Sequence, residues 1–178
     1  GRPYVTPLSA APGGPARGAA GLRVHVVTGG GAGVDLTQEL VRLGFSPSLG
    51  VVSVFDSDYQ AAQELGLMVI SAPPFQPLSA ESIREHQELI HDADCVVLAP
   101  QVYGEGNLAD LDVARTALEA GAAVIVVTDP AVETRDLTGG AATALQARLL
   151  EAGATAVPDA HAAVMKVSAL ASLSTKGG

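Results

Sequence analysis

The chain has 178 residues, about the length of one domain. Hydrophobic residues make up 48% of it and aromatic residues only 3%, so the core must be aliphatic, as in a parallel sheet covered by helices. The formal net charge is −9, from 19 acidic and 10 basic residues, and the basic residues are scattered. Nucleic acid and anionic membrane surfaces are therefore unexpected partners. Cys95 is the single cysteine, which excludes an internal disulfide and a cysteine-based metal cluster.

The first part of the chain differs in composition from the rest. Residues 1–20 are rich in Pro, Gly and Ala and have no hydrophobic period, which predicts a linker or extended arm. Residues 21–178 are expected to form a single Rossmann-like α/β domain. No apolar stretch approaches the roughly 20 residues of a membrane span, and no signal peptide is visible, so we expect a cytoplasmic protein.

Short aliphatic runs alternate with helical patterns along residues 21–178. The predicted strands are Leu22–Thr28, Val51–Phe55, Leu67–Ile70, Cys95–Ala99 and Ala122–Val127, with Thr155–Val157 as a candidate sixth. The alternation predicts right-handed βαβ units and a doubly wound parallel sheet of about five strands, in the order 3-2-1-4-5, with helices on both faces. Ligands bind such sheets where the strand order reverses, here between strands one and four.

A glycine run follows the first predicted strand and precedes a helix. Gly29, Gly30, Gly31 and Gly33 allow close approach of a ligand to the backbone, and the helix N-terminus favours a phosphate or carboxylate. The alternative is a tight turn that serves only helix–sheet packing. No Lys-Ser/Thr follows the glycines, so the run is not a Walker A motif and no ATP hydrolysis is expected.

Three further segments could line the same crevice. The loop after strand four, with Asn107 as an expected N-cap, could form the other wall, or it could be a plain loop and cap. The acids after strand two could hold a ribose hydroxyl, or Asp58 could cap a short helix. Arg135 could clamp an anion, or could pair with Asp136 and shape its loop. The ligand-binding candidates in these segments are Asp56, Asp58, Gly104, Glu105, Gly106, Asn107 and Arg135.

Metal binding and hydrolase chemistry find little support. The histidines, at positions 25, 86, 91 and 161, form no ligand spacing, so no metal site is expected. No nucleophile elbow supports Ser-His-Asp chemistry.

Several segments of the chain resemble the domain that follows the ATPase module in some corrinoid (cobalamin) and iron-siderophore type ABC transporter ATP-binding proteins. The resemblance rests on VHVVTGGGAG, LGVVSVFDSD, APPFQPLS, ADCVVLAP, GEGNL and RDLTGG, in that order, and on the opening GRPYVTP. It implies a parent protein that hydrolyses ATP in an upstream module, with ATP as the cofactor of that module only. The partners implied are that module and its transporter, which would hold this domain near the membrane. Leu137 departs from the aromatic residue expected there.

A second likeness is to Rossmann-like phosphoribohydrolases, also called lysine decarboxylase-like proteins. Their G-G-x-G-T-x-x-E segment falls on Tyr103–Asp110, with Asp110 at the catalytic Glu. Tyr103 replaces the first Gly and Asp is shorter than Glu, which puts N-glycosidic hydrolysis in doubt but leaves nucleotide binding possible.

Three functions therefore compete. The favoured one is a non-catalytic regulatory domain that senses a nucleotide-like or corrinoid-related molecule. The others are a nucleotide phosphoribohydrolase using Asp110 or Glu105, and a structural dimerisation domain. A two-fold homodimer is expected because the resemblance implies a domain attached to each of two paired ATPase modules. The many small apolar residues of Ala141–Ala152 and Ala160–Leu173 add support. Alternatively, the C-terminal segment packs back on its own sheet.

Overall fold

The computed structural model of the protein describes residues 21–28, 31–51, 64, 69–71, 80–99, 102–103, 105–129 and 135–177. Six strands form one sheet: β1 (Val24–Thr28), β2 (Ser48–Val51), β3 (Val69–Ser71), β4 (Cys95–Ala99), β6 (Ala123–Val127) and β8 (Thr155–Val157). Five helices surround it: α1 (Gly31–Arg42), α3 (Ala80–Asp92), α4 (Glu105–Glu119), α5 (Ala141–Glu151) and α6 (Ala160–Gly177). Among these residues, no helix is both long and apolar enough to cross a lipid bilayer.

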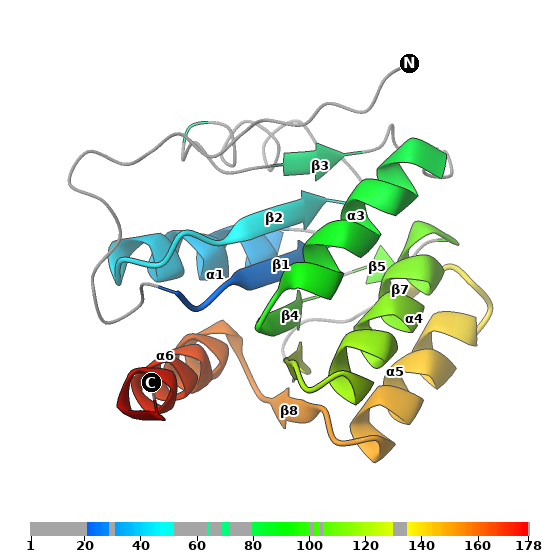
Figure 1. The fold of residues 1–178 in the computed structure, drawn as a ribbon. Helices are drawn as coiled ribbons and strands as arrows, with labels where there is room; N and C mark the ends of the chain where they lie inside the picture. The colour runs from blue at the N-terminus through cyan, green and yellow to red at the C-terminus, as the bar shows by residue number, and fades with distance from the viewer. Residues whose placement is uncertain are drawn as a thin grey trace.

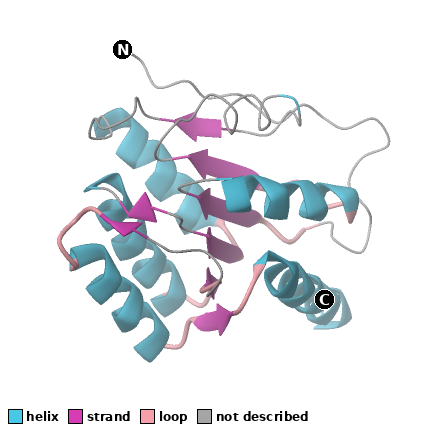
Figure 2. Cartoon of the chain, turned by 180° about the vertical axis from the view of Figure 1, so that it is seen from behind, coloured by secondary structure: helices cyan, strands magenta, loops and turns pink. Residues whose placement is uncertain are grey.

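The sheet has the order β3-β2-β1-β4-β6-β8, and every neighbouring pair is parallel. Figure 2 shows the strands side by side, with helices on both sides of them. The predicted doubly wound sheet is therefore confirmed, and the candidate sixth strand extends it beyond β6. We call the two ends of the sheet its amino end and its carboxyl end, after the direction of the strands.

The second strand starts earlier than predicted. It begins at Ser48 rather than Val51, and residues 52–55 lie outside the described part of the chain. Ser48 pairs with His25 of β1, and the two side chains share a 2.7 Å hydrogen bond between Oγ and Nδ1. Ser48 and Gly50 are poor strand formers by themselves, so pairing with β1 overrides their local preference.

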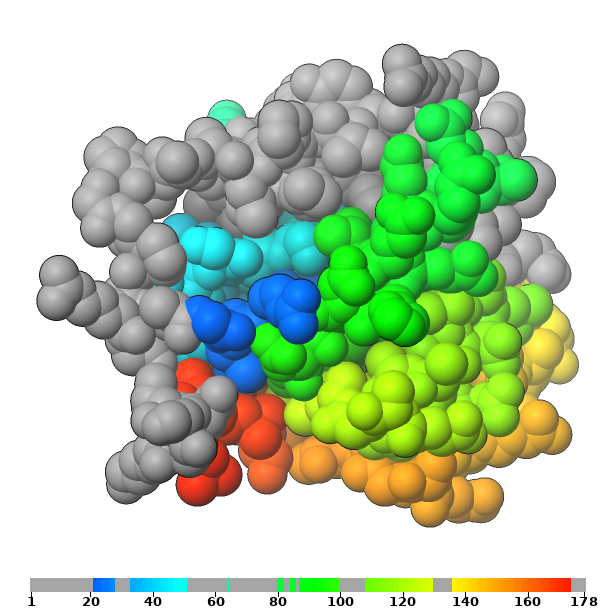
Figure 3. Space-filling model, viewed as in Figure 1, coloured from blue at the N-terminus to red at the C-terminus, as the bar shows by residue number. Residues whose placement is uncertain are grey.

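Side chains alternate between two aliphatic cores on the two faces of the sheet. On β4, Cys95 and Val97 point into the core formed with α1 and α6, whereas Val96 and Leu98 point into the core formed with α3, α4 and α5. Figure 1 shows these helices on the two sides of the strands. In Figure 3, α3, α4 and α5 form one continuous surface, in green to orange. Burial on both faces explains why the central strands read as unbroken apolar runs.

Three helices end at the amino end of the sheet in the same way. After α1, Gly44 has φ 91°, its N–H donates to Val41 O, and the Phe45 N–H donates to Leu40 O. This is a Schellman motif, and its left-handed residue favours glycine. Helices α4 and α5 end alike at Gly121 and Gly153. Each motif ends its helix and leads the chain into the next strand within a few residues.

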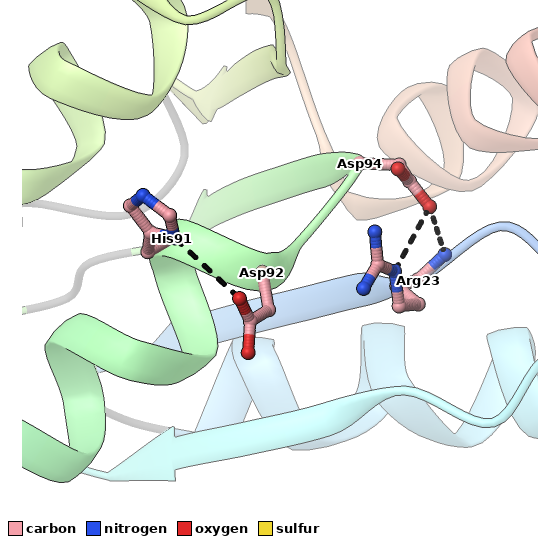
Figure 4. A network of polar contacts seen from close by, with 4 residues as sticks. All are labelled: Arg23, His91, Asp92 and Asp94. Carbon is pink, nitrogen blue, oxygen red and sulfur yellow. Dashed lines mark hydrogen bonds and ion pairs between the residues drawn. The ribbon is translucent and has the colours of Figure 1, made fainter.

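The amino end also carries a polar link between β1 and β4 (Figure 4). The Asp94 carboxylate accepts from the Arg23 backbone N–H at 2.8 Å and from Arg23 Nε at 3.5 Å. In return, the Asp94 N–H donates to Arg23 O at 2.8 Å. The nearby His91–Asp92 pair, at 3.4 Å, joins two exposed side chains. Asp94 thus fixes the register at the start of the two central strands.

A second, two-stranded sheet was not predicted. β5 (Val102–Tyr103) and β7 (Arg135–Asp136) pair in parallel, Val102 with Arg135 and Tyr103 with Asp136. Figure 1 shows both beyond the tips of the main strands, beside the start of α4. A strand of two residues is too short to show an alternation of apolar and polar side chains, so this pairing could not be predicted from the sequence.

The C-terminal segment forms α6, which packs back on its own sheet. Ala163, Val164, Val167 and Ala171 are buried in the same core as α1. This confirms the alternative stated for the segment. Met165 and Leu173, in contrast, remain exposed.

Candidate functional site

The candidate site lies at the carboxyl end of the sheet, between β1 and β4. The two strands are adjacent, and their last residues, Thr28 and Ala99, pair with each other. The helices that follow go to opposite faces: Leu36 of α1 lies in one core and Leu111 of α4 in the other. The strand order therefore reverses here, as predicted, and the two helix N-termini diverge from neighbouring points.

The start of α1 is formed by the predicted glycine run. Gly31 is its first residue and Gly33 is buried in its first turn, where the Gly33 carbonyl accepts from Thr37 Oγ1 at 2.6 Å. The first turn carries no acidic side chain. The residue ahead of the helix is Gly30, which has no side chain that could accept from the amides of the first turn.

Two other helices that begin at the carboxyl end have their first amides bound by protein side chains. At α5, the Thr143 N–H donates to Asp136 Oδ2 at 3.1 Å, and the Ala142 N–H donates to Thr138 Oγ1 at 2.9 Å. At α6, the Ala162 N–H donates to Asp159 Oδ1 at 2.7 Å. An anion at either position would have to displace an aspartate or a threonine of the chain itself.

Asp136 is the most strongly perturbed carboxylate at this end of the sheet. Hydrogen bonds from the side chains of Thr138 and Thr143 hold its pKa well below the usual range, and the backbone amides of both threonines add to the effect. The side chain of Arg135 lies outside what the structure describes, so its expected contact with Asp136 stays a prediction. The described partners of the Asp136 carboxylate are two threonines. Aspartate side chains often accept from the backbone N–H two residues on, as Asp136 does from Thr138, so the aspartate itself was the available clue.

The two-stranded sheet brings two predicted segments together. Pairing of β5 with β7 sets Arg135 beside Val102, so the loop after β4 and the loop after β6 meet at the carboxyl end. Helix α4 begins at Glu105, so Gly106 and Asn107 lie in its first turn. The expectation that Asn107 caps this helix is wrong, because the helix starts two residues earlier.

Several predicted site residues lie outside the described part of the chain. They are Gly29, Gly30, Asp56, Asp58 and Gly104. Their roles stay predictions.

A buried carboxylate lies on α4 close to this site. Asp110 is 2% exposed and stands one turn before Ala114, which is fully buried. It is five residues beyond Glu105, or about 7.5 Å along the helix from its start. Its position is the one that corresponds to the catalytic Glu in the phosphoribohydrolase likeness. Acidic side chains are rarely fully buried, which marks this residue for functional tests.

The remaining reactive side chains lie away from the site. His25 is buried inside β1 and bonded to Ser48. Burial raises the pKa of the Cys95 thiol to about 12, with a further contribution from Asp94, so the thiol is unreactive near neutral pH. Within the described ranges, no three His, Cys, Asp or Glu side chains form a group that could hold a metal ion.

Comparisons with solved structures give distant likenesses only. DNA processing protein A from Helicobacter pylori, described with a single-stranded DNA binding mode, is 12% identical, with a TM-score of 0.48, over 82% of this chain and 80% of that one. Phenylacrylic acid decarboxylase from Aquifex aeolicus is 15% identical, with a TM-score of 0.44, over 77% and 80%. A short-chain dehydrogenase/reductase from Veillonella parvula DSM 2008, in complex with NADP, is 15% identical, with a TM-score of 0.38, over 61% and 48%. At these scores the likenesses carry no functional argument.

The family comparison is stronger. No curated protein matches the chain. The MJ0874 family, in contrast, matches residues 47–164, which include the whole loop after β4, Asp110 and Arg135. The matched part starts after the glycine run of α1. It covers well over half of the chain, and the protein belongs to the MJ0874 family.

Proposed function

We propose that the chain is a non-catalytic ligand-binding domain that takes a nucleotide-like or corrinoid-related anionic molecule between the starts of α1 and α4. One contrast supports this most. The first amides of α6 are bound by Asp159, and those of α5 by Asp136 and Thr138, which lie just before the Gly139-Gly140 turn; the residue before α1, Gly30, offers no side-chain acceptor. Free amides at a helix N-terminus are a natural site for a phosphate or carboxylate.

The regulatory part of the proposal has a different source. Attachment to the ATPase module of a corrinoid or siderophore transporter rests on the sequence resemblance alone. On this proposal, ligand binding biases the attached module, and the domain itself turns over no ATP. ATP turnover by the purified chain that is lost on changing Gly31 would contradict the non-catalytic part.

Calorimetric titration of the purified chain with AMP, ATP and cyanocobalamin tests the binding. We expect saturable binding of at least one of these. The Gly31→Val variant should weaken it by about 100-fold, because a branched side chain at the start of α1 blocks close approach to the backbone. Unfolding of the variant should remain cooperative.

Ala141→Val provides the matched control. It adds the same kind of bulk at the first residue of α5, an exposed position at the same end of the sheet, where protein side chains already bind the amides. Its ligand affinity should equal that of the wild type. Equal weakening by both substitutions, or no binding by the wild type at millimolar ligand, would refute the proposed site.

The burial of Asp110 favours one second candidate, hydrolysis of a nucleoside 5′-monophosphate. In that reaction water adds to C1′ of the ribose, the C1′–N bond breaks and a proton reaches the leaving base, giving free base and ribose 5-phosphate. Asp110 would exchange the proton. Chromatography of AMP incubated with the chain decides between the two: adenine release that Asp110→Asn abolishes would replace the binding proposal with an enzyme.

A further inference from the structure

The Asp136 carboxylate binds two threonines at the start of α5. Oδ1 accepts from the backbone N–H of Thr138 at 2.8 Å and from its Oγ1, and Oδ2 accepts from the backbone N–H of Thr143 at 3.1 Å and from its Oγ1 at 2.6 Å. Thr138 Oγ1 also accepts from the Ala142 N–H. A single side chain thus closes the turn through Gly139 and Gly140, both at positive φ, onto the first turn of the helix.

The same residue belongs to β7. There it pairs with Tyr103 of β5, and α4 begins only two residues after Tyr103. Helices α4 and α5 pack side by side along their lengths. The two-stranded sheet therefore spans from the start of one helix to the start of the other, and Asp136 attaches it to α5.

We propose that Asp136 is a positioning residue. It holds β7 on the start of α5, and because β7 pairs with β5, it also fixes β5 and the start of α4, which follows β5. The inference rests on the proposed function in so far as the start of α4 is a wall of the ligand site. Asp136 itself makes its bonds to Thr138 and Thr143, so it acts on the ligand through the backbone of β5 and α4.

The network lies at the surface. Thr143 is exposed and Asp136 is half-buried, so loss of these hydrogen bonds should leave the two aliphatic cores intact. Asp159 gives a matched comparison, because it caps α6 at the same end of the sheet but lies between β8 and α6 and is not part of the two-stranded sheet. A variant at either position removes a helix cap, and only the variant at Asp136 loosens β5.

Hydrogen exchange measured by mass spectrometry is the direct test. In Asp136→Asn, an amide NH2 faces one of the threonine donors in place of a carboxylate oxygen. Peptides that contain β5 and the first turn of α4 should then exchange about tenfold faster, while β4 stays protected. In Asp159→Asn, β5 should exchange as in the wild type. Unchanged exchange of β5 in Asp136→Asn, or equal acceleration in both variants, overturns the inference.

Thr143 supplies a second route if Asp136→Asn folds poorly. Thr143→Val keeps the shape of the side chain and removes its hydroxyl, and Thr143→Ser keeps the hydroxyl. We expect faster exchange of β5 in the Val variant and wild-type exchange in the Ser variant. Equal behaviour of the two variants would contradict the role of the hydroxyl bond.

AMP titration of the same variants links the exchange result to the site. Asp136→Asn should weaken AMP binding by about tenfold, with Asp159→Asn unchanged. Wild-type affinity in an Asp136→Asn variant whose β5 exchanges faster overturns the positioning role. If the wild type binds no AMP, ATP or cyanocobalamin, the proposed function fails, and the exchange of β5 still decides whether Asp136 fixes this backbone.

Discussion

The two ends of the sheet handle their polar groups differently. At the amino end, helices α1, α4 and α5 all close in the same glycine motif, and Asp94 binds Arg23 across the two central strands. At the carboxyl end, side chains of Asp136 and Asp159 accept from the first amides of α5 and α6, while α1 follows Gly30. The polar groups of the amino end thus serve stability, whereas the carboxyl end holds the proposed ligand site. Substitutions at the amino end should therefore change unfolding and leave binding unaffected.

The largest expected effect is on the amino-end half of α1. Leu40 is fully buried in its last turn, and Leu40→Ala should lower the free energy of unfolding by about 2–5 kcal/mol, since it leaves a cavity. Leu43 is 49% exposed just beyond the helix, and Leu43→Ala should cost less than about 0.5 kcal/mol. Urea unfolding measures both. Similar losses in the two variants would show that the end of α1 is not packed as described.

The link between β1 and β4 should have a smaller effect. Asp94→Ala removes the acceptor of the Arg23 backbone N–H and should cost about 1 kcal/mol. Asp92→Ala breaks only an exposed pair with His91 and should cost less than about 0.5 kcal/mol. AMP affinity should be unchanged in both. A loss of affinity in Asp94→Ala would mean that the two ends are coupled.

The carboxyl end should respond to acid through Asp136. Its folded-state pKa is depressed, so its contribution to stability is fully present above the unfolded pKa, near about 4, and is lost as the pH falls further toward the folded pKa. The difference in unfolding free energy between the wild type and Asp136→Asn should be constant from about pH 7 to pH 5 and should shrink below about pH 4. A difference that instead grows on acidification would contradict the assigned hydrogen bonds.

Self-association should be the weakest effect. We predict a two-fold dimer through the exposed side of α6, where Met165 is 57% and Leu173 67% exposed. Light scattering should give a dimer mass for the wild type and for Ala147→Glu, on the exposed side of α5, and a monomer mass for Leu173→Glu. A monomeric wild type refutes the prediction, and a monomeric Ala147→Glu with dimeric Leu173→Glu would move the interface to α5.

The sequence predicted the fold wherever burial alone decides structure. β1, β4 and β6 are continuous apolar runs, and each was located to within two residues at either end. β2 was located late because Ser48 and Gly50 join the sheet through their partners in β1 rather than by their own preference. Helix α6 was described only by its small apolar residues, since Ala and Ser do not distinguish a helix on the core from an exposed surface.

The point where the strand order reverses was predictable, because it follows from the alternation of strands and helices, but the polar contacts around it were not. The role of Asp136 depends on Thr143, seven residues away, and on a partner strand some 33 residues earlier, for which no local pattern exists. Asn107 was read as a cap because its side chain suits one, yet the helix begins before it.

The parallel pairing of β1 with β4 has a consequence for synthesis of the protein. Arg23 and Asp94, which join the two central strands, are 71 residues apart in the chain. At about 5–20 residues per second, the ribosome needs roughly 4–14 seconds to make that stretch. During this time the backbone edge of β1 that pairs with β4 has no partner. Non-local pairing of this kind is slow and prone to aggregation. The nascent chain is therefore expected to depend on chaperones most between the synthesis of β1 and the synthesis of β4.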